Sequence, residues 1–142
     1  MKRFAVAIML LVCTLSGAQN RFSCDFKLYD KKTDAKPLVS GIAYVQDNCY
    51  RIESAEGFVV GNGTTRWLYR SQSEELVIED DDSSIFRNLT LVQSSESTAT
   101  VTYSKYRAEL TKIKSTEILP VQFFSVDVKS LGPDVITTDL RD

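Results

Sequence analysis

The sequence contains no histidine, and this absence removes several kinds of site at once. Histidine is the commonest metal ligand, the usual general base near neutral pH and the group that activates the nucleophile in Ser-His and Cys-His enzymes. The adjacent carboxylates Glu74 and Glu75 offer no substitute, because neighbours on a strand point to opposite faces. We therefore expect a protein that is not an enzyme, with no catalytic residues, no metal and no cofactor.

A strong excess of one charge is also missing. The chain has 17 basic and 19 acidic residues, which gives a formal net charge of -2. Proteins that bind nucleic acids neutralise phosphates with basic surfaces, so nucleic acid is not an expected partner. The acidic run Glu79 to Asp82 lacks the spacing, the glycine and the closing glutamate of an EF-hand loop, and we expect a solvated loop there.

The longest apolar run, Phe4 to Leu15, is too short for a membrane-spanning helix, which needs about 20 residues. It follows Lys2 and Arg3 and precedes Ser16-Gly17-Ala18, the order of a secretory signal peptide. We expect residues 1–18 to be a cleaved signal peptide. Residues 19–142 then form one exported globular domain, in line with 43% hydrophobic and 25% charged residues.

Cysteine is scarce, with three in the whole chain, and Cys13 lies within the expected signal peptide. Cys24 and Cys49 remain as an even pair in an oxidising compartment, which makes them a disulfide candidate. The alternative is two buried free thiols, since Cys24 lies on the apolar side of an alternating segment.

No long window has a helical period, whereas apolar and polar residues alternate from Phe22 to Leu28, as in a half-buried strand. Similar β-branched and aromatic runs recur between Gly-, Asn-, Ser- and Pro-bearing turns. We expect a mostly β protein with about nine or ten short antiparallel strands, in one strongly curved sheet or unclosed barrel. The expected strands are 22–28, 38–45, 49–53, 58–60, 66–70, 76–78, 84–92, 98–103, 106–114 and 121–128, followed by a helical turn near 129–131.

Aromatic residues are the main candidates for a site. Trp67 and Tyr69 lie two apart on one expected strand and share a face, as do Tyr50 and Ile52 on another. They form either an ordinary core or an apolar groove, because a curved sheet with no long helix to cover it leaves its concave face open. The candidate groove residues are Tyr50, Ile52, Phe58, Trp67 and Tyr69.

The central segment is similar to the periplasmic outer-membrane lipoprotein carrier family, called LolA-like. The similarity lies in Gly41 to Val45, Tyr50-Arg51-Ile52-Glu53, the hairpin Val60 to Tyr69, and Glu75 to Ile78. The end of the chain, Val121 to Arg141, resembles the tail of the LolA-like proteins of Bacteroidetes-type bacteria.

The resemblance implies a bent, unclosed antiparallel barrel in the periplasm of a Gram-negative bacterium. Its concave apolar face would hold the acyl chains of a lipoprotein or other lipid during outer-membrane lipoprotein sorting. By motif position, Arg51 matches an arginine that contacts the covering helices and helps to open and close the cavity.

Compared with the family, the stretch between Val77 and Tyr106 is short, without room for the expected lid helix. The groove is then covered by an envelope protein partner or a second copy, or the protein has a different role. That alternative role is an exported, non-enzymatic β-sheet module that docks to another envelope protein.

Overall fold

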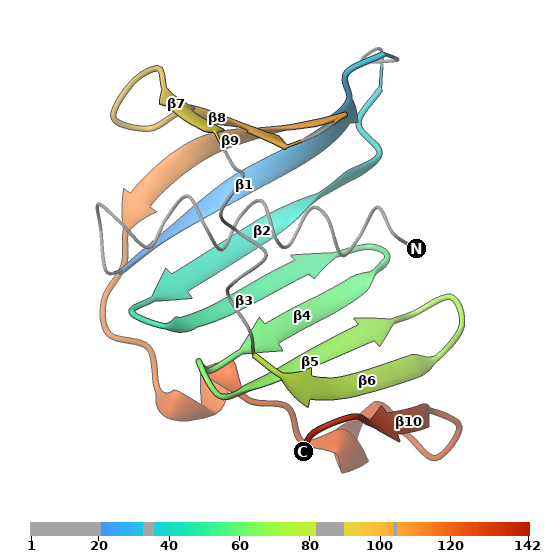
Figure 1. Cartoon of the computed structure of the whole chain (residues 1–142). Coiled ribbons are helices and arrows are strands. Elements are labelled where there is room, and N and C mark those ends of the chain that lie inside the picture. Colours follow the sequence, from blue (N-terminus) through green and yellow to red (C-terminus); the bar gives the residue numbers. More distant parts are fainter. Residues whose placement is uncertain (1–20, 33–35, 82–89, 104) are drawn as a thin grey trace.

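The structure is a computed structural model that describes residues 21–32, 36–81, 90–103 and 105–142. Within them lie ten strands and two short 3-10 helices (Figure 1). The expected signal peptide, residues 1–18, lies outside the described residues. The strands are β1 (Arg21–Asp30), β2 (Val39–Gln46), β3 (Cys49–Ser54), β4 (Gly57–Gly61), β5 (Thr65–Arg70), β6 (Glu75–Asp80), β7 (Thr90–Gln93), β8 (Ala99–Tyr103), β9 (Tyr106–Ser115) and β10 (Ile136–Asp139), and the 3-10 helices are η2 (Val121–Phe124) and η3 (Val128–Leu131).

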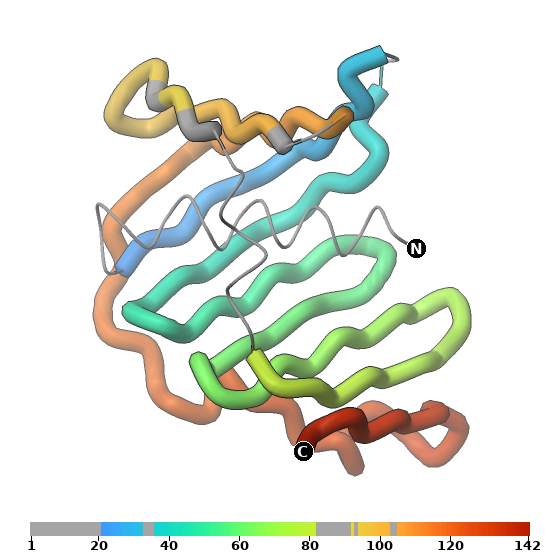
Figure 2. Tube along the Cα trace, in the orientation of Figure 1, coloured from blue at the N-terminus to red at the C-terminus, as the bar shows by residue number. Residues whose placement is uncertain are grey.

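All ten strands belong to one sheet, in the order β10-β6-β5-β4-β3-β2-β1-β9-β8-β7. Every pairing is antiparallel except that of β10 with β6, which is parallel. The sheet is strongly curved and does not close into a barrel, so the predicted fold class is confirmed (Figure 2).

One source of the curvature is a bulge between β1 and β9. Ser23 pairs with Lys114 and Asp25 with Thr111, so two residues of β9 face a single residue of β1. Lys112, inside the bulge, has a positive φ of 53°. An extra residue on one strand bends the ladder and increases its local twist.

Short polar turns join the strands, as the sequence predicts. Asp47 takes a φ of 53° in the turn between β2 and β3, a conformation that aspartate tolerates better than most residues. In the turn between β4 and β5, the Asn62 side chain accepts hydrogen bonds from the backbone N–H groups of Thr64 at 3.0 Å and Thr65 at 2.8 Å. These local contacts fix where each strand begins.

The predicted strand 121–128 is wrong. Residues Val121–Phe124 form the 3-10 helix η2 directly after Pro120, and no strand occupies the rest of this range. Only Phe124 of η2 is fully buried, so the segment lacks the alternating buried face of a strand. The predicted turn near 129–131 is confirmed as η3, whereas β10 was not predicted.

Apolar residues are buried on both faces of the sheet. The larger core lies on one face and extends from β8 through β1 to β5. A smaller set lies on the other face of β4 and β6, where Val60, Leu76 and Ile78 are buried, as is Phe124 of η2. The middle of the sheet is therefore packed on two sides.

Candidate functional site

The strand registers sort side chains onto two faces. Cross-strand partners share a face, and residues alternate between faces along each strand. The core face carries the row Cys24, Ala43, Ile52, Val59, Leu68 and Val77. The outer face carries the row Tyr44, Arg51, Val60, Trp67 and Ile78.

The five predicted groove residues do not form one groove. Tyr50 and Ile52 lie on the core face, with 2% and 0% of their surfaces exposed. Phe58, Trp67 and Tyr69 lie half-buried on the outer face, where Phe58 stacks on Tyr69 with ring centroids 5.2 Å apart. Each pair within a strand shares a face as predicted, but Ile52 pairs with Val59, which puts Phe58 on the opposite side.

The core face is apolar without interruption over β8, β9, β1 and β2. Its described side chains there are buried, and several of them are small: Ala99, Val101, Tyr106, Ala108, Leu110, Phe22, Cys24, Phe26, Leu28, Val39, Ala43 and Val45. The 3-10 helix η2 lies on the opposite, outer face, where the Phe123 ring meets Tyr44 and Arg51. The core face is thus a continuous buried apolar region, and we take it as the candidate site for an apolar ligand.

Over β5 and β6 the core face is no longer uniformly apolar. One apolar row there, with Leu68 and Val77, lies between two charged rows. In the first charged row Arg66 pairs with Glu79, and in the second Arg70 pairs with Glu75. The core face is thus apolar at one end and charged at the other.

A hydrogen-bonded cluster around Tyr50 lies at one edge of the core face. The Tyr50 hydroxyl donates to Asp81 Oδ1 at 3.1 Å, and the Gly63 N–H donates to Asp81 Oδ2 at 3.1 Å. Burial and the neighbouring Asp81 carboxylate raise the pKa of Tyr50, which keeps the hydroxyl protonated as a donor. The Tyr50 ring covers Gly61, where a Cβ atom would overlap it.

Arg66 lies in the same cluster, and its guanidinium is closely paired with a carboxylate. Its Nε and Nη2 atoms lie 2.9 Å and 2.8 Å from Glu79 Oε1. Burial opposes its charge, but the Glu79 and Asp81 carboxylates outweigh burial and raise the pKa of Arg66. Glu79 and Asp81 are therefore tied into the sheet, and the expectation of a freely solvated acidic loop fails for them.

Arg51, the predicted gating residue, lies on the outer face. Its Nη1 donates to the Phe123 carbonyl at 3.1 Å, and its Nε pairs with Glu53 at 2.6 Å. The guanidinium also lies 5.0 Å from the centroid of the Phe123 ring. Arg51 thus contacts the 3-10 helix η2 on the side away from the core face, whereas the resemblance implies contact with helices that cover the cavity. Here it holds η2 to β3.

Cys24 and Cys49 are free thiols, and the predicted disulfide is not formed. Cys24 lies on the core face of β1 and Cys49 on the outer face at the start of β3, with β2 between them. Two strand spacings are about 9.6 Å, whereas disulfides need Cα atoms within about 7 Å. The alternative of two unlinked thiols is what the fold contains.

Alkylation should therefore recover both thiols from unreduced protein. Burial, aided by Asp25, raises the pKa of Cys24 to about 12, so the native thiol stays protonated and unreactive at about pH 8. Cys49 is only partly buried, although burial, Asp47 and Asp81 raise its pKa too. We expect iodoacetamide to label Cys49 first and Cys24 only after unfolding, as read by peptide mass spectrometry. A Cys24–Cys49 disulfide-linked peptide would contradict this.

Among the described residues, no group of three or more Cys, Asp or Glu side chains is placed to hold a metal ion. The same ranges also contain no helix that is long and apolar enough to cross a membrane.

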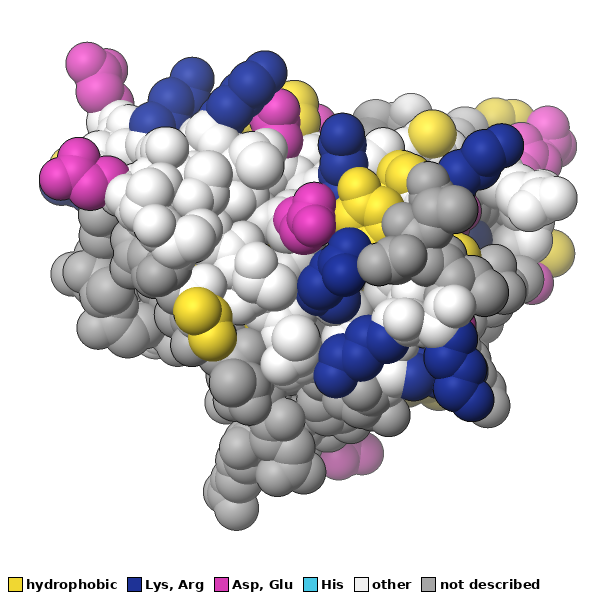
Figure 3. All heavy atoms as spheres, turned by 90° about the horizontal axis from the view of Figure 1, so that it is seen from above, with side chains coloured by type: hydrophobic (Ala, Val, Ile, Leu, Met, Phe, Trp, Pro, Cys, Tyr) yellow, Lys and Arg dark blue, Asp and Glu magenta, His cyan; other side chains and the backbone are white. Residues whose placement is uncertain are grey.

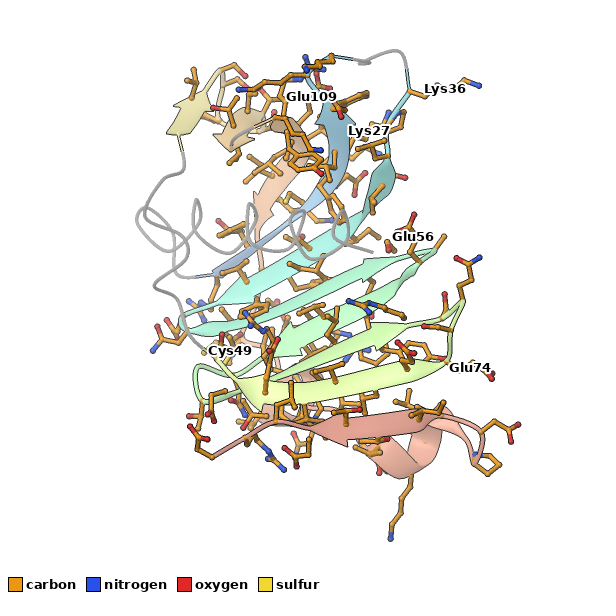
Figure 4. All side chains as sticks on the ribbon, turned by 45° about the vertical axis from the view of Figure 1, so that its right-hand side comes forward. Lys27, Lys36, Cys49, Glu56, Glu74 and Glu109 are labelled. Carbon is orange, nitrogen blue, oxygen red and sulfur yellow. The ribbon has the colours of Figure 1, made fainter. Side chains whose placement is uncertain are left out.

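Several Lys and Arg side chains are exposed on the side of the molecule seen in Figure 3. The Lys31 N–H donates to the Lys105 carbonyl at 2.8 Å, which brings the turn after β1 next to the turn between β8 and β9. Lys27 and Lys36, labelled in Figure 4, lie at the same end as these turns, and both are exposed.

Several residues of the charged rows and of η2 were not predicted from the sequence. Arg66, Leu68 and Arg70 alternate with the aromatic residues of β5. The charged rows on the face opposite Trp67 could therefore have been predicted from the sequence. The contact of Phe124 with the outer face had no local signal, because the composition of its segment is that of a strand.

Comparisons with known proteins bear on the fold alone. No family model matches the chain, and no curated protein matches it either. Among solved structures, the fold is similar to that of an uncharacterized conserved protein from Thermus thermophilus, with a TM-score of 0.50 and 12% identity over 95% of this chain and 99% of that one. At this identity the similarity shows a shared architecture and assigns no activity.

Proposed function

We propose that this protein is an exported, non-enzymatic carrier or chaperone that holds the acyl chains of a lipid or lipoprotein on its core face. The setting that fits the resemblance is the periplasm, with outer-membrane lipoprotein sorting as the process. The observation that carries the proposal is the unbroken apolar core face over β8, β9, β1 and β2, whose side chains are buried on the side of the sheet away from η2.

The physical case rests on the cost of moving acyl chains through water. Each buried methylene contributes about 0.8 kcal/mol, so a lipid anchor needs an apolar host to leave a membrane. The small side chains of Ala43, Ala99 and Ala108 lie among the larger ones of the core face. The sheet ends in β10 and β7, which are not paired with each other within the described chain.

Lipid binding can be tested directly and with a matched pair of variants. Native mass spectrometry of protein isolated from its host after export should show bound lipid. A fluorescent fatty acid should bind the emptied protein, and Ala43→Leu should weaken this binding roughly threefold or more, because it fills the core face. Ser40→Leu adds similar bulk on the exposed outer side of β2 and should leave binding unchanged.

Absence of both bound lipid and fatty-acid uptake would overturn the carrier proposal in favour of the docking module. Equal loss of binding in the two variants, with unchanged thermal melting, would place the lipid somewhere other than the core face.

A further inference from the structure

Two arginines of β5 lie on the core face, and they differ in how closely their guanidinium groups contact an acidic partner. Arg66 makes two short contacts with Glu79, at 2.9 Å and 2.8 Å. Arg70 has one long contact, 3.8 Å from its Nη1 to Glu75 Oε2. The two glutamates occupy equivalent positions on β6, so the difference is not one of register.

The Arg70 side chain is 28% exposed, but its Nε atom is buried and has no hydrogen-bond partner among the described residues. The hydroxyl of Ser73, in the turn that joins β5 to β6, is also buried without a partner there. Buried polar groups are nearly always paired, because an unmade hydrogen bond to a buried charged group is costly. Two such groups in one hairpin point to a ligand with acceptor oxygens.

We propose that Arg70 binds the anionic head group of an amphiphile, a carboxylate or a phosphate, whose acyl chain lies along the core face. This inference rests on the proposed function and adds the class of its ligand. A guanidinium presents its N–H donors in a planar fork that matches both kinds of oxyanion, and a charged hydrogen bond gains strength away from water.

The path from Arg70 to the apolar surface follows one cross-strand row. From Arg70 the row continues through Gly57, Ser54 and Gly41 to Phe26 of β1. Three strand spacings of about 4.8 Å place Arg70 about 14 Å from Gly41, a length that suits part of an extended acyl chain. The row has small side chains until it reaches Phe26, whose ring lies over Gly41.

The nearby carboxylates do not prevent an anion from binding at Arg70. Glu75 is the carboxylate in the same row, and its side chain is 42% exposed, so it can turn to solvent when an anion arrives. Glu74 lies in the turn and points away from the sheet (Figure 4). Arg66, by contrast, would have to give up Glu79 to bind an anion, which makes Arg70 the better candidate.

The test compares two probes that differ only in head-group charge. Fluorescence titrations with cis-parinaric acid and with its methyl ester would use the full exported protein, stripped of lipid. We expect the acid to bind about tenfold more tightly than the ester, the effect of one charge-assisted hydrogen-bonded contact. Arg70→Gln should remove this preference while leaving ester binding unchanged, and Arg70→Lys should retain part of it.

Lys27→Gln is the matched control, because it removes one positive charge from the outer face of β1 and should not alter the preference. Equal affinity of the two probes for the unaltered protein would overturn the head-group assignment and leave the carrier proposal standing. A preference that survives in Arg70→Gln would do the same. Failure of both probes to bind would overturn the carrier proposal together with this inference. Thermal melting of each variant separates these outcomes from misfolding.

Discussion

Gly57→Ala should lower the free energy of unfolding by about 2–6 kcal/mol, which makes it one of the most damaging small substitutions in this chain. Gly57 has a φ of 142°, a conformation that costs any residue with a side chain about 1–3 kcal/mol. An added Cβ would also overlap the backbone carbonyl oxygen of Tyr69 on β5, so the strands must move apart, at a further cost of about 1–3 kcal/mol. Urea denaturation measures the loss.

Gly132→Ala is the control for this substitution. Gly132 also has a positive φ, of 102°, but no atom lies within 4 Å of the added Cβ. We expect a loss of about 1–3 kcal/mol from backbone strain alone. Equal losses in the two variants would show that the contact between β4 and β5 is looser than described. Because Gly57 pairs with Arg70, Gly57→Ala should also disturb the row that leads to the proposed head-group position.

Phe124→Ala should cost about 3–5 kcal/mol, the range for removing a fully buried phenylalanine. Phe124 is 1% exposed, and it belongs to the smaller core on the outer face. Without the Phe124 ring, η2 would be held to the sheet by the weaker contacts that remain, which are the Arg51 hydrogen bond to the Phe123 carbonyl and the contacts of the Phe123 ring. We expect the segment after β9 to detach locally, which limited proteolysis of residues 116–135 would detect at temperatures below the main unfolding transition.

Phe123→Ala provides the comparison. Phe123 is only half-buried, and its ring meets Tyr44 edge-on at 5.0 Å and the Arg51 guanidinium at 5.0 Å. We expect a loss of about 1–2 kcal/mol from these contacts. A larger loss for Phe123→Ala than for Phe124→Ala would mean that Arg51 and Phe123, rather than the buried ring, hold the C-terminal segment.

Much of the strand plan could be predicted, because alternation and turn residues are local properties. Eight of the ten strands, β1 to β6, β8 and β9, match expected segments to within one or two residues at most ends. The expected strand 84–92 overlaps β7, and its first part lies outside the described residues. The turns could be predicted for the same reason, because Asp47 and Asn62 act through backbone groups a few residues away.

The C-terminal segment shows where local pattern fails. Residues Val121–Phe124 have the β-branched and aromatic composition of a strand, yet they form a 3-10 helix held by Arg51 and by burial of Phe124. β10 has four exposed residues and is held to β6 mainly through backbone bonds, such as that from the Ile136 N–H to the Glu74 carbonyl at 2.9 Å. No pattern of side chains marks a strand of this kind.

The sequence by itself determined a mostly β domain without the residues of a histidine-based site, and it determined which residues within one strand share a face. Only the tertiary structure decided how the faces of different strands combine. The register between β3 and β4 puts Ile52 opposite Val59, and this single pairing separates Tyr50 and Ile52 from Phe58, Trp67 and Tyr69. The physical reason is that a strand has a period of two, so one residue of offset in a turn reverses the facing of everything that follows. The same registers place Arg70 on the apolar face and Arg51 on the other, a distinction between two strand arginines that no local pattern could make.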